Sequence, residues 1–336
     1  MHVSDFDYEL PADRIAQTPV EPRDLARLLV DRGSGRYDHR RVRDLPEYLT
    51  PGDLVVVNDT KVLPARLNLV RSTGGAVEVL LLEPLDEYSR KWVALVRPGG
   101  RLKDGEFLRH QRTGSEVLFC GRRDSGDSFE VELCHDGDAL TFIETIGKLP
   151  LPPYVTSEVN DTARYQTVYA RRPASTAAPT AGLHLTQELI ERLRSKGIEF
   201  ASVELVVGVD TFRPIQTEDP REHEIHSEFF SVPESTLELA EKAERVVAIG
   251  TTAVRSMESV ATFGELSGRT QLFIHGDYEW KMVDLLLTNF HMPRTTLLLL
   301  IDAFTNGGWR EIYAAALAHE YRFLSFGDAM LLERRG

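Results

Sequence analysis

The chain has 336 residues, of which 42% are hydrophobic and 27% charged, and its formal net charge is −13. A chain of this length can form one large domain or two domains with a substantial core, and its composition is typical of soluble globular proteins. The negative charge argues against binding nucleic acid over the whole surface, but it allows a local basic patch. The two cysteines, Cys120 and Cys134, make neither a disulfide framework nor a zinc site.

No part of the sequence predicts a membrane span or an export signal. The longest apolar run, 295–301, is too short to cross a bilayer. The first seven residues lack the basic and apolar regions of a signal peptide. We therefore expect a cytoplasmic protein that does not associate with a membrane.

Residues 1–65 lead to a polar turn. They predict strands at 5–10 and 25–31, a short helix begun by Asp44, and a buried apolar strand at 54–57. That last strand runs into Asn58, Asp59 and Lys61. Open α/β sheets place their sites at the carboxyl ends of such strands, but Asn and Asp also favour turns for local reasons. Both interpretations stay open.

The pattern of apolar and polar residues changes between residues 66 and 142. Short apolar runs at 66–70, 77–82, 92–96, 116–119 and 129–133 are separated by Gly, Asp and Ser, with no helical pattern between them. This spacing predicts a small antiparallel barrel or sandwich. The proline-rich segment 149–154 indicates the exit from this module, because such segments are stiff and extended.

Cations alternate with aromatic residues shortly after that exit. The segment contains Tyr165, Tyr169, Arg171 and Arg172. Such a mixture can hold a nucleic-acid strand by charge and stacking, and it is equally typical of an ordinary helix face.

Beyond residue 180, helical and strand patterns alternate. Helices are predicted at 187–196, 234–245 (with Ser231 as cap), 251–258, 295–304 and 309–319, and strands at 199–207, 246–249, 285–287 and 330–332. This order predicts a mainly parallel or mixed sheet covered by helices. The fold class is therefore α/β: a large layered domain of residues 1–65 and 154–336, interrupted by a small antiparallel β-barrel domain of residues 66–153.

Three stretches beyond residue 177 carry candidate chemistry. The uncharged segment 177–186 contains Thr180 and one titratable residue, His184, just before a helix. Small residues before a helix N-terminus let backbone N–H groups approach a ligand, although a tight connection would look the same. The two others follow buried strands: Gly250-Thr251-Thr252 begins a helix, and Asn289 is followed by His291. We expect these groups and Asn58 at one sheet edge.

The turn at Thr251 and Thr252 suits a carboxylate or a phosphate. Arg255 lies on the same helix face and can bind an anionic ligand or pair with Glu258. Phosphate-binding loops, the dinucleotide fingerprint and the serine nucleophile elbow are absent from the sequence. The histidines of the His223–His226 segment lack zinc-protease spacing, so we predict no metal.

The residues match a known family over nearly the whole chain. The matching stretches are 6–11, 23–24, 57–66, 149–154, 165–169, 178–184, 226–228, 250–256, 288–291, 321–323 and 327–330. In these stretches the chain resembles the S-adenosylmethionine:tRNA ribosyltransferase-isomerases of queuosine biosynthesis. It departs from the family pattern at Leu185, at Asp210 and in the segment His275-Gly276-Asp277.

The resemblance implies a large α/β domain interrupted by a small β-barrel. It also implies a reaction: the ribosyl part of S-adenosylmethionine is transferred and rearranged onto 7-aminomethyl-7-deazaguanine at the wobble position of tRNA. Epoxyqueuosine-tRNA, adenine and methionine result. S-adenosylmethionine is then the ribosyl-donor substrate, no prosthetic group or metal is implied, and the partner is a tRNA anticodon arm. We expect a monomer.

On this basis each candidate residue has an expected role. His184 or His291 transfers protons. The substrate-binding set is Asn58, Asp59, Thr180, Thr251, Thr252, Arg255 and Asn289, in which the two threonines of the 250–252 turn hold the methionine carboxylate. The tRNA-binding set is Lys61, Arg66, Tyr165, Tyr169, Arg171 and Arg172, with a tyrosine stacking on a base.

Other functions remain open at this point. The chain can be an S-adenosylmethionine-dependent RNA methyltransferase, although it lacks an early glycine-rich turn. It can be a divergent paralogue that uses another acceptor. It can also bind RNA without catalysis, which the acidic balance disfavours.

Overall fold

The computed structural model describes residues 1–123, 128–157, 161–208 and 214–335. The chain divides into two compact units: Met1–Lys61, Pro153–Arg172 and Ala178–Gly336 form the first, and Val62–Pro152 with Pro173–Ala177 form the second. The domain boundaries expected from the sequence lie within four residues of these. The exception is 173–177, which belongs to the second unit, where Leu63 N–H donates to the Ser175 carbonyl at 2.9 Å.

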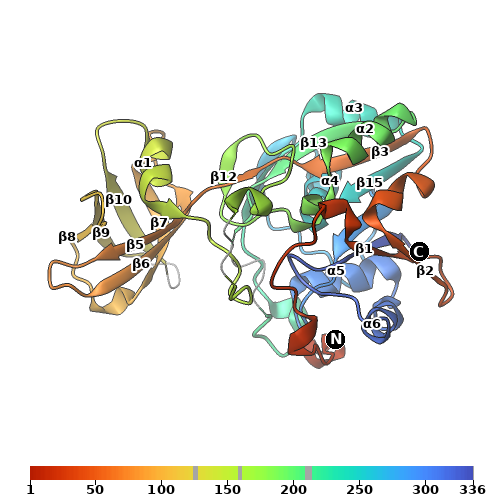
Figure 1. The fold of residues 1–336 in the computed structure, drawn as a ribbon, viewed down its shortest axis with the longest axis horizontal. Helices are drawn as coiled ribbons and strands as arrows, with labels where there is room; N and C mark the ends of the chain where they lie inside the picture. Colours follow the sequence, from red (N-terminus) through yellow and green to blue (C-terminus); the bar gives the residue numbers. More distant parts are fainter. Residues whose placement is uncertain (124–127, 158–160, 209–213, 336) are drawn as a thin grey trace. The chain divides into compact units, whose positions relative to one another are not determined.

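A nine-stranded mixed sheet forms the centre of the first unit (Figure 1). Its order is β16 (Ser267–Thr270), β14 (Glu228–Ser231), β13 (Glu199–Leu205), β3 (Asp53–Asn58), β15 (Arg245–Ile249), β17 (Leu285–Asn289), β18 (Ala329–Glu333), β1 (Arg27–Asp31) and β2 (Tyr37–Arg41). The four strands β13, β3, β15 and β17 run parallel, while β17 and β18 pair antiparallel. The carboxyl ends of four central strands therefore lie along one sheet edge.

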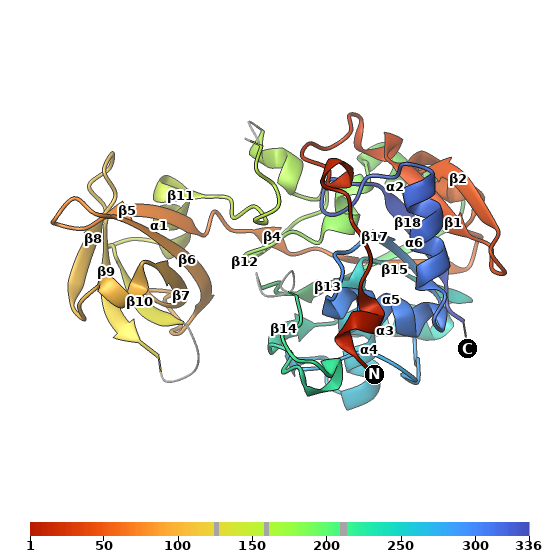
Figure 2. The same cartoon turned by 90° about the horizontal axis from the view of Figure 1, so that it is seen from below.

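Helices cover both faces of this sheet (Figure 1). The α-helices of the first unit are α2 (Gln187–Ser195), α3 (Glu234–Lys242), α4 (Thr251–Phe263), α5 (Thr296–Thr305) and α6 (Trp309–Ala318). Its 3₁₀ turns are η1 (Val3–Phe6), η2 (Ala12–Arg14), η3 (Arg23–Leu25), η4 (Val42–Glu47), η6 (Thr162–Tyr165), η7 (Thr180–His184) and η9 (Pro220–Glu222). The N-terminal segment, red in Figure 2, lies beside the C-terminal helices, where the Arg310 guanidinium donates to the Asp5 carbonyl.

The core is layered because successive strand side chains point to opposite faces. Val55 and Val57 of β3 pack into a cluster with Leu189 and Leu193 of α2. Leu54 and Val56 are also fully buried, so β3 is covered on both faces, as its uninterrupted apolar sequence predicts.

The second unit is an antiparallel barrel (Figure 2). Its strands are β5 (Arg66–Val70), β6 (Ala76–Pro84), β7 (Lys91–Arg97), β8 (Glu106–Arg109), β9 (Glu116–Arg122), β10 (Phe129–Cys134) and β11 (Gly147–Lys148). The order is β11-β5-β6-β7-β10-β9-β8, and a further β5–β8 pairing closes the sheet. Buried and less buried residues alternate along β9 and β10, which is the pattern of a closed sheet with a filled interior.

The barrel unit also contains short elements outside its strands. These are η5 (Gly99–Arg101) and α1 (Ala139–Ile146), and a two-stranded sheet joins β12 (Pro173–Ser175) to β4 (Lys61–Val62). Helix α1 starts at Asp138, whose carboxylate accepts from the Thr141 N–H at 2.8 Å. The sequence pattern did not indicate this helix, which spans only eight residues.

Several predictions of local structure were wrong. The expected strand at 5–10 is instead the turn η1 followed by irregular chain, held by long-range contacts. Helix α3 starts after Pro233, because the proposed cap Ser231 lies inside strand β14.

Within the described residues, no helix is long and apolar enough to cross a bilayer.

Candidate active site

A pocket opens in the first unit where β15 and β17 end. It encloses about 590 Å³ of empty space, counting its open mouth. It is lined by Tyr154, Ala178–Ala181, Val207, Gly250–Thr252, Thr288–Met292, Thr295, Leu297, Leu324 and Ser325. Most of these are strand-end or loop residues at the carboxyl edge of the parallel strands, which is the position where open α/β sheets bind ligands.

One wall of the pocket is the N-terminus of α4. Gly250 precedes the helix with a φ of 91°, a conformation that favours glycine, and Thr251 and Thr252 form the first turn. The N–H groups of a first helical turn have no acceptor inside the helix. The Thr252 hydroxyl is buried and has no hydrogen-bond partner in the described part of the chain. This wall therefore offers donors and a positive helix end to an anionic group.

Asn289, the last residue of β17, forms a second wall. Its Oδ1 accepts a hydrogen bond from the Thr180 hydroxyl at 2.9 Å, and its Nδ2 lies 3.1 Å from His184 Nε2. Thr180 and Asn289 line the pocket, whereas His184 lies behind them and is 5% exposed. Burial, with smaller contributions from the Arg322 and Arg23 cations, lowers the pKa of His184 to about 4. The imidazole is thus neutral near pH 7.

His291 lines the pocket two residues further on. Its backbone is held on both sides: the N–H donates to the Tyr313 hydroxyl at 3.0 Å, and the carbonyl accepts from the Tyr8 hydroxyl. Its Nε2 lies 3.3 Å from the Thr288 hydroxyl. Burial lowers the pKa of His291 to about 3, so this imidazole is also neutral near pH 7.

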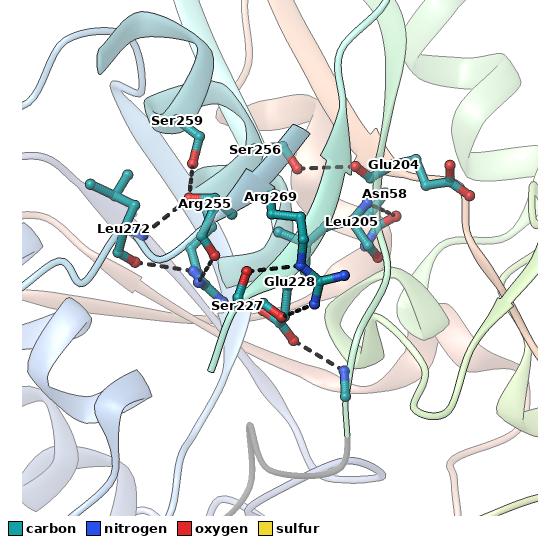
Figure 3. Close-up of polar contacts among 12 residues, drawn as sticks. Asn58, Glu204, Leu205, Ser227, Glu228, Arg255, Ser256, Ser259, Arg269 and Leu272 are labelled. Carbon is teal, nitrogen blue, oxygen red and sulfur yellow. Dashed lines mark hydrogen bonds and ion pairs between the residues drawn. The ribbon is translucent and has the colours of Figure 1, made fainter. Parts of the chain in front are cut away.

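Arg255 does not reach the pocket. Its guanidinium forms a buried ion pair with Glu228 and donates to the Leu272 carbonyl at 3.2 Å (Figure 3). Glu258, the expected alternative partner, instead accepts from the N–H groups of 281–283 and from Tyr278. The expected pairing with Glu258 was therefore wrong, because strand β14 supplies the counter-ion of Arg255, and Arg255 is not among the residues that line the pocket.

The Arg255–Glu228 pair nevertheless supports the pocket indirectly. Glu228 Oε1 accepts from the Gly208 N–H at 3.0 Å, and the neighbouring Val207 is a lining residue. The pair thereby connects α4 to the segment that follows β13.

Asn58 is fully buried and is not among the lining residues. Its Nδ2 donates to the Leu205 carbonyl at 3.0 Å and its Oδ1 accepts from the Leu205 N–H at 3.2 Å (Figure 3). The side chain thus continues the β3–β13 ladder, which is the turn-like role that the sequence left open.

Three predicted cations come together beyond β3. The Lys61 N–H donates to the Arg172 carbonyl, and the Arg171 N–H donates to the Asp59 carbonyl, each at 2.8 Å. The side chains of Arg171 and Arg172 are 77% and 59% exposed, with Asp59 and Glu204 as their respective counter-ions. Burial is the main cause that raises the pKa of Asp59. Asp59 pairs with Arg171 and is not among the residues that line the pocket.

The other tRNA candidates lie elsewhere. Arg66 belongs to the barrel, where it pairs with Glu78 at 3.0 Å. Tyr165 is fully buried and packs edge-to-face on Phe326, with ring centroids 5.9 Å apart. It cannot stack on a base in this structure, so that prediction is corrected.

Tyr169 is also held inside the fold. A methyl group on Gly182 would come within 2.0 Å of its hydroxyl oxygen, so the Gly182 backbone and Tyr169 are in close contact. This contact explains the glycine at that position and leaves the ring packed on the core cluster, not free to stack on RNA.

Some lining residues were missed by the sequence analysis. Tyr154 and Ser325 share a hydrogen bond of 2.6 Å between their hydroxyl groups and both line the pocket. Tyr8 and Tyr313 position His291 from outside it. Tyr154 and Tyr8 do fall in stretches that carry the family resemblance, which was the available signal.

The departures from the family pattern are only partly placed. Asp210 lies outside the described residues. Leu185 belongs to the buried core cluster, and His275 packs against Phe273 with centroids 4.6 Å apart. Among the described residues, no group of three or more His, Cys, Asp or Glu side chains is arranged to hold a metal ion.

The fold and pocket define a two-unit α/β protein with a helix N-terminus, an amide and an imidazole at one sheet edge. Residues 3–332 match the family described as "Queuosine biosynthesis protein", and the chain belongs to this family.

Its relatives carry a more specific name. Two proteins named S-adenosylmethionine:tRNA ribosyltransferase-isomerase, from Thermotoga maritima and Symbiobacterium thermophilum, are 48% and 47% identical to it; each alignment covers 99% of this chain and 100% of the relative. A crystal structure of S-adenosylmethionine tRNA ribosyltransferase from Thermotoga maritima superposes with a TM-score of 0.55 at 39% identity, covering 98% of this chain and 99% of that one.

Proposed function

We propose that this protein is an S-adenosylmethionine:tRNA ribosyltransferase-isomerase. It transfers and isomerises the ribosyl group of S-adenosylmethionine onto 7-aminomethyl-7-deazaguanine at the tRNA wobble position. Adenine and methionine leave, and epoxyqueuosine-tRNA is the product. The full-length relatives of that name support the reaction, and a cytoplasmic location is consistent with tRNA as the substrate.

One observation carries the proposal: a helix N-terminus shares a pocket with Asn289 and His291, and its Thr252 hydroxyl has no hydrogen-bond partner among the described residues. S-adenosylmethionine has an anionic carboxylate at one end and a ribose in the middle. The carboxylate suits the N-terminus of α4, since the helix dipole and the free N–H groups both favour negative charge. The ribose then lies toward the strand-end amide and imidazole.

The chemistry asks little beyond proton transfer and exclusion of water. The sulfonium acidifies the ribose 5′ carbon and makes methionine a good leaving group. The protein must supply a base for that proton and an acid for departing adenine. We assign the proton transfer to His291 because it is the imidazole that lines the pocket. No prosthetic group enters this scheme, because the donor substrate carries the reactive centre.

The tRNA backbone is assigned to the cations that flank β4. Arg171 and Arg172 are exposed and lie next to Lys61 on adjoining segments. Contacts from such side chains to phosphates position RNA without reading its sequence. Recognition of the deazaguanine base belongs to the pocket and not to the buried tyrosines.

The test is incubation with S-adenosylmethionine and tRNA that carries 7-aminomethyl-7-deazaguanine, followed by nucleoside mass analysis. The expected result is the epoxyqueuosine mass together with free adenine and methionine. tRNA with unmodified guanine at the same position is the matched control and should give no product. S-adenosylhomocysteine would instead indicate a methyltransferase, and tRNA binding without consumption of S-adenosylmethionine would indicate a binding protein.

A further inference from the structure

The His184–Asn289 pair determines which hydrogen-bonding group Asn289 presents to the pocket. Asn289 has three polar neighbours: the Thr180 hydroxyl 2.9 Å from Oδ1, His184 Nε2 at 3.1 Å from Nδ2, and the Asp328 carbonyl at 3.5 Å from Nδ2. A carbonyl oxygen accepts hydrogen bonds only, so it must face the amide nitrogen and not the amide oxygen. The orientation of the Asn289 amide follows.

The Asp328 carbonyl is itself firmly placed. The Asp328 side chain is 2% exposed and accepts from the N–H groups of Arg27 and Arg322 at 2.9 and 2.8 Å. These bonds connect the start of β1 to the turn before β18. The reference group that orients Asn289 is therefore part of the sheet framework.

This orientation fixes the role of His184. Because Asn289 Nδ2 donates toward it, His184 Nε2 must offer its lone pair, and the ring proton then lies on Nδ1. The cations Arg322 and Arg23 act on His184 from nearby and oppose its protonation. If the ring were protonated, the Nε2–H of His184 would face the Nδ2–H of Asn289, which are both donors. The Asn289 amide would then have to rotate by about 180° to present its oxygen to His184.

We propose that His184 is a positioning residue that holds the Oδ1 atom of Asn289 toward the pocket as an acceptor for a hydroxyl or amino group of the ligand. An amide oxygen has two lone pairs, and Thr180 uses one of them. Both Thr180 and Asn289 line the pocket, and we assign the second lone pair to the ligand. His184 acts through Asn289 and does not touch the ligand, since it is not a lining residue.

The ligand class follows from this polarity. A donor is required opposite Asn289, which on S-adenosylmethionine is a ribose hydroxyl, the adenine amine or the methionine ammonium. The assignment of S-adenosylmethionine as the ligand rests on the proposed function. Its 2′-deoxy and 3′-deoxy analogues, the analogue with hypoxanthine in place of adenine and the analogue that lacks the α-amino group separate the three sources.

The experiment measures binding of S-adenosylmethionine by calorimetry and turnover on modified tRNA. H184L should weaken binding about tenfold, as expected for losing one oriented hydrogen bond to the ligand. H184Q should recover most of that loss, because Gln Oε1 can accept at the position of Nε2. The double variant H184L/N289L should bind no more weakly than N289L alone. H110Q, on the exposed surface of the barrel, is the control and should match the wild type.

The pH profile separates positioning from proton transfer. H184Q should keep the acidic limb of the wild-type rate profile. If H184Q lost turnover about a hundredfold or more while still binding S-adenosylmethionine, and its acidic limb disappeared, His184 would be the acid–base group and the inference overturned. Additive losses in the double variant would also overturn it. The inference would stand and the proposed function would be rejected if the variants showed the expected differences in binding S-adenosylmethionine but the wild-type protein left modified tRNA unchanged.

Discussion

The hydroxyl of Tyr8 donates a hydrogen bond to the main-chain carbonyl of His291, although 283 residues separate them. The same segment is fastened twice more, by an ion pair between Asp7 and Arg294 and by the Arg294 N–H donating to the Phe6 carbonyl at 2.9 Å. The N-terminal segment thus holds in place the loop that carries His291, and we call this set of contacts the N-terminal clamp.

Tyr8→Phe tests this clamp. Losing the hydroxyl leaves a buried carbonyl of His291 without that donor, so we expect about 1 kcal/mol lower unfolding free energy. Turnover should fall while the affinity for S-adenosylmethionine stays close to wild type, because the imidazole loses its support and the α4 wall does not. Urea titration and steady-state kinetics measure the two effects. Tyr37→Phe is the control: its buried hydroxyl has no partner among the described residues, and its removal should be nearly neutral.

Thr252→Val removes the unpartnered hydroxyl at the N-terminus of α4. We expect affinity for S-adenosylmethionine to fall about tenfold, since a charge-assisted hydrogen bond is lost, and Thr252→Ser to restore most of it. Decarboxylated S-adenosylmethionine should bind Thr252→Val and wild type equally. A loss of affinity of the same size for both ligands would place the carboxylate elsewhere.

The buried pair Arg255–Glu228 should contribute to the free energy of unfolding and not to binding of the charged ligand. Arg255→Met leaves the Glu228 carboxylate buried and uncompensated, which we expect to cost about 3–5 kcal/mol. The double variant Arg255→Met/Glu228→Gln should cost less than the sum of the single variants, as double-mutant analysis by urea unfolding will show. Were Arg255→Met fully stable but unable to bind S-adenosylmethionine, the ligand role would be reinstated.

Stability should fall as the pH decreases from about 6.5 to about 4. The folded protein holds His184 with a pKa of about 4 and His291 with one of about 3, both below the usual 6.5. In that range the unfolded chain binds protons that the folded chain does not, so stability rises with pH and is complete above about 6.5. His184 alone accounts for about 3 kcal/mol on this basis. Urea midpoints at several pH values should show a shallower dependence in His184→Gln than in wild type.

Arg171→Ala and Arg172→Ala should each weaken tRNA binding and reduce the slope of log affinity against log salt by about 1. Binding of S-adenosylmethionine should be unaffected, because neither residue lines the pocket. Arg109→Ala is the matched control, since Arg109 is exposed on the barrel and paired with Glu116 in the same way. Equal salt slopes in all three variants and wild type would remove these cations from the tRNA interface.

Local sequence predicted the fold well where a single pattern was strong. The buried strand β3 and the helix expected at 187–196 follow from the pattern of apolar residues, and both occur as expected. The short helix α1 was missed, and the strand expected at 5–10 is absent because contacts from the C-terminal part of the chain hold that segment.

The sequence predicted the site residues that lie at the ends of recognisable strands. Thr251, Thr252 and His291 follow buried strands and Asn289 ends one, and because β15 and β17 are parallel neighbours, the structure brings them to one pocket. Arg255 and Tyr165 were misjudged, since no spacing along the chain reveals the Glu228 counter-ion or the Phe326 ring that encloses the tyrosine.

The sequence by itself determined the alternation of strands and helices, the inserted barrel and the polar residue types at strand ends, because these depend on neighbours within one or two turns of chain. Only the tertiary structure decided which polar group faces the pocket and which is consumed by the framework. That choice depends on partners more than a hundred residues away, as with His184 behind Asn289 and Asn58 bound to Leu205. A side chain's chemistry is set by its residue type, but its availability to a ligand is set by what the fold has already bonded to it.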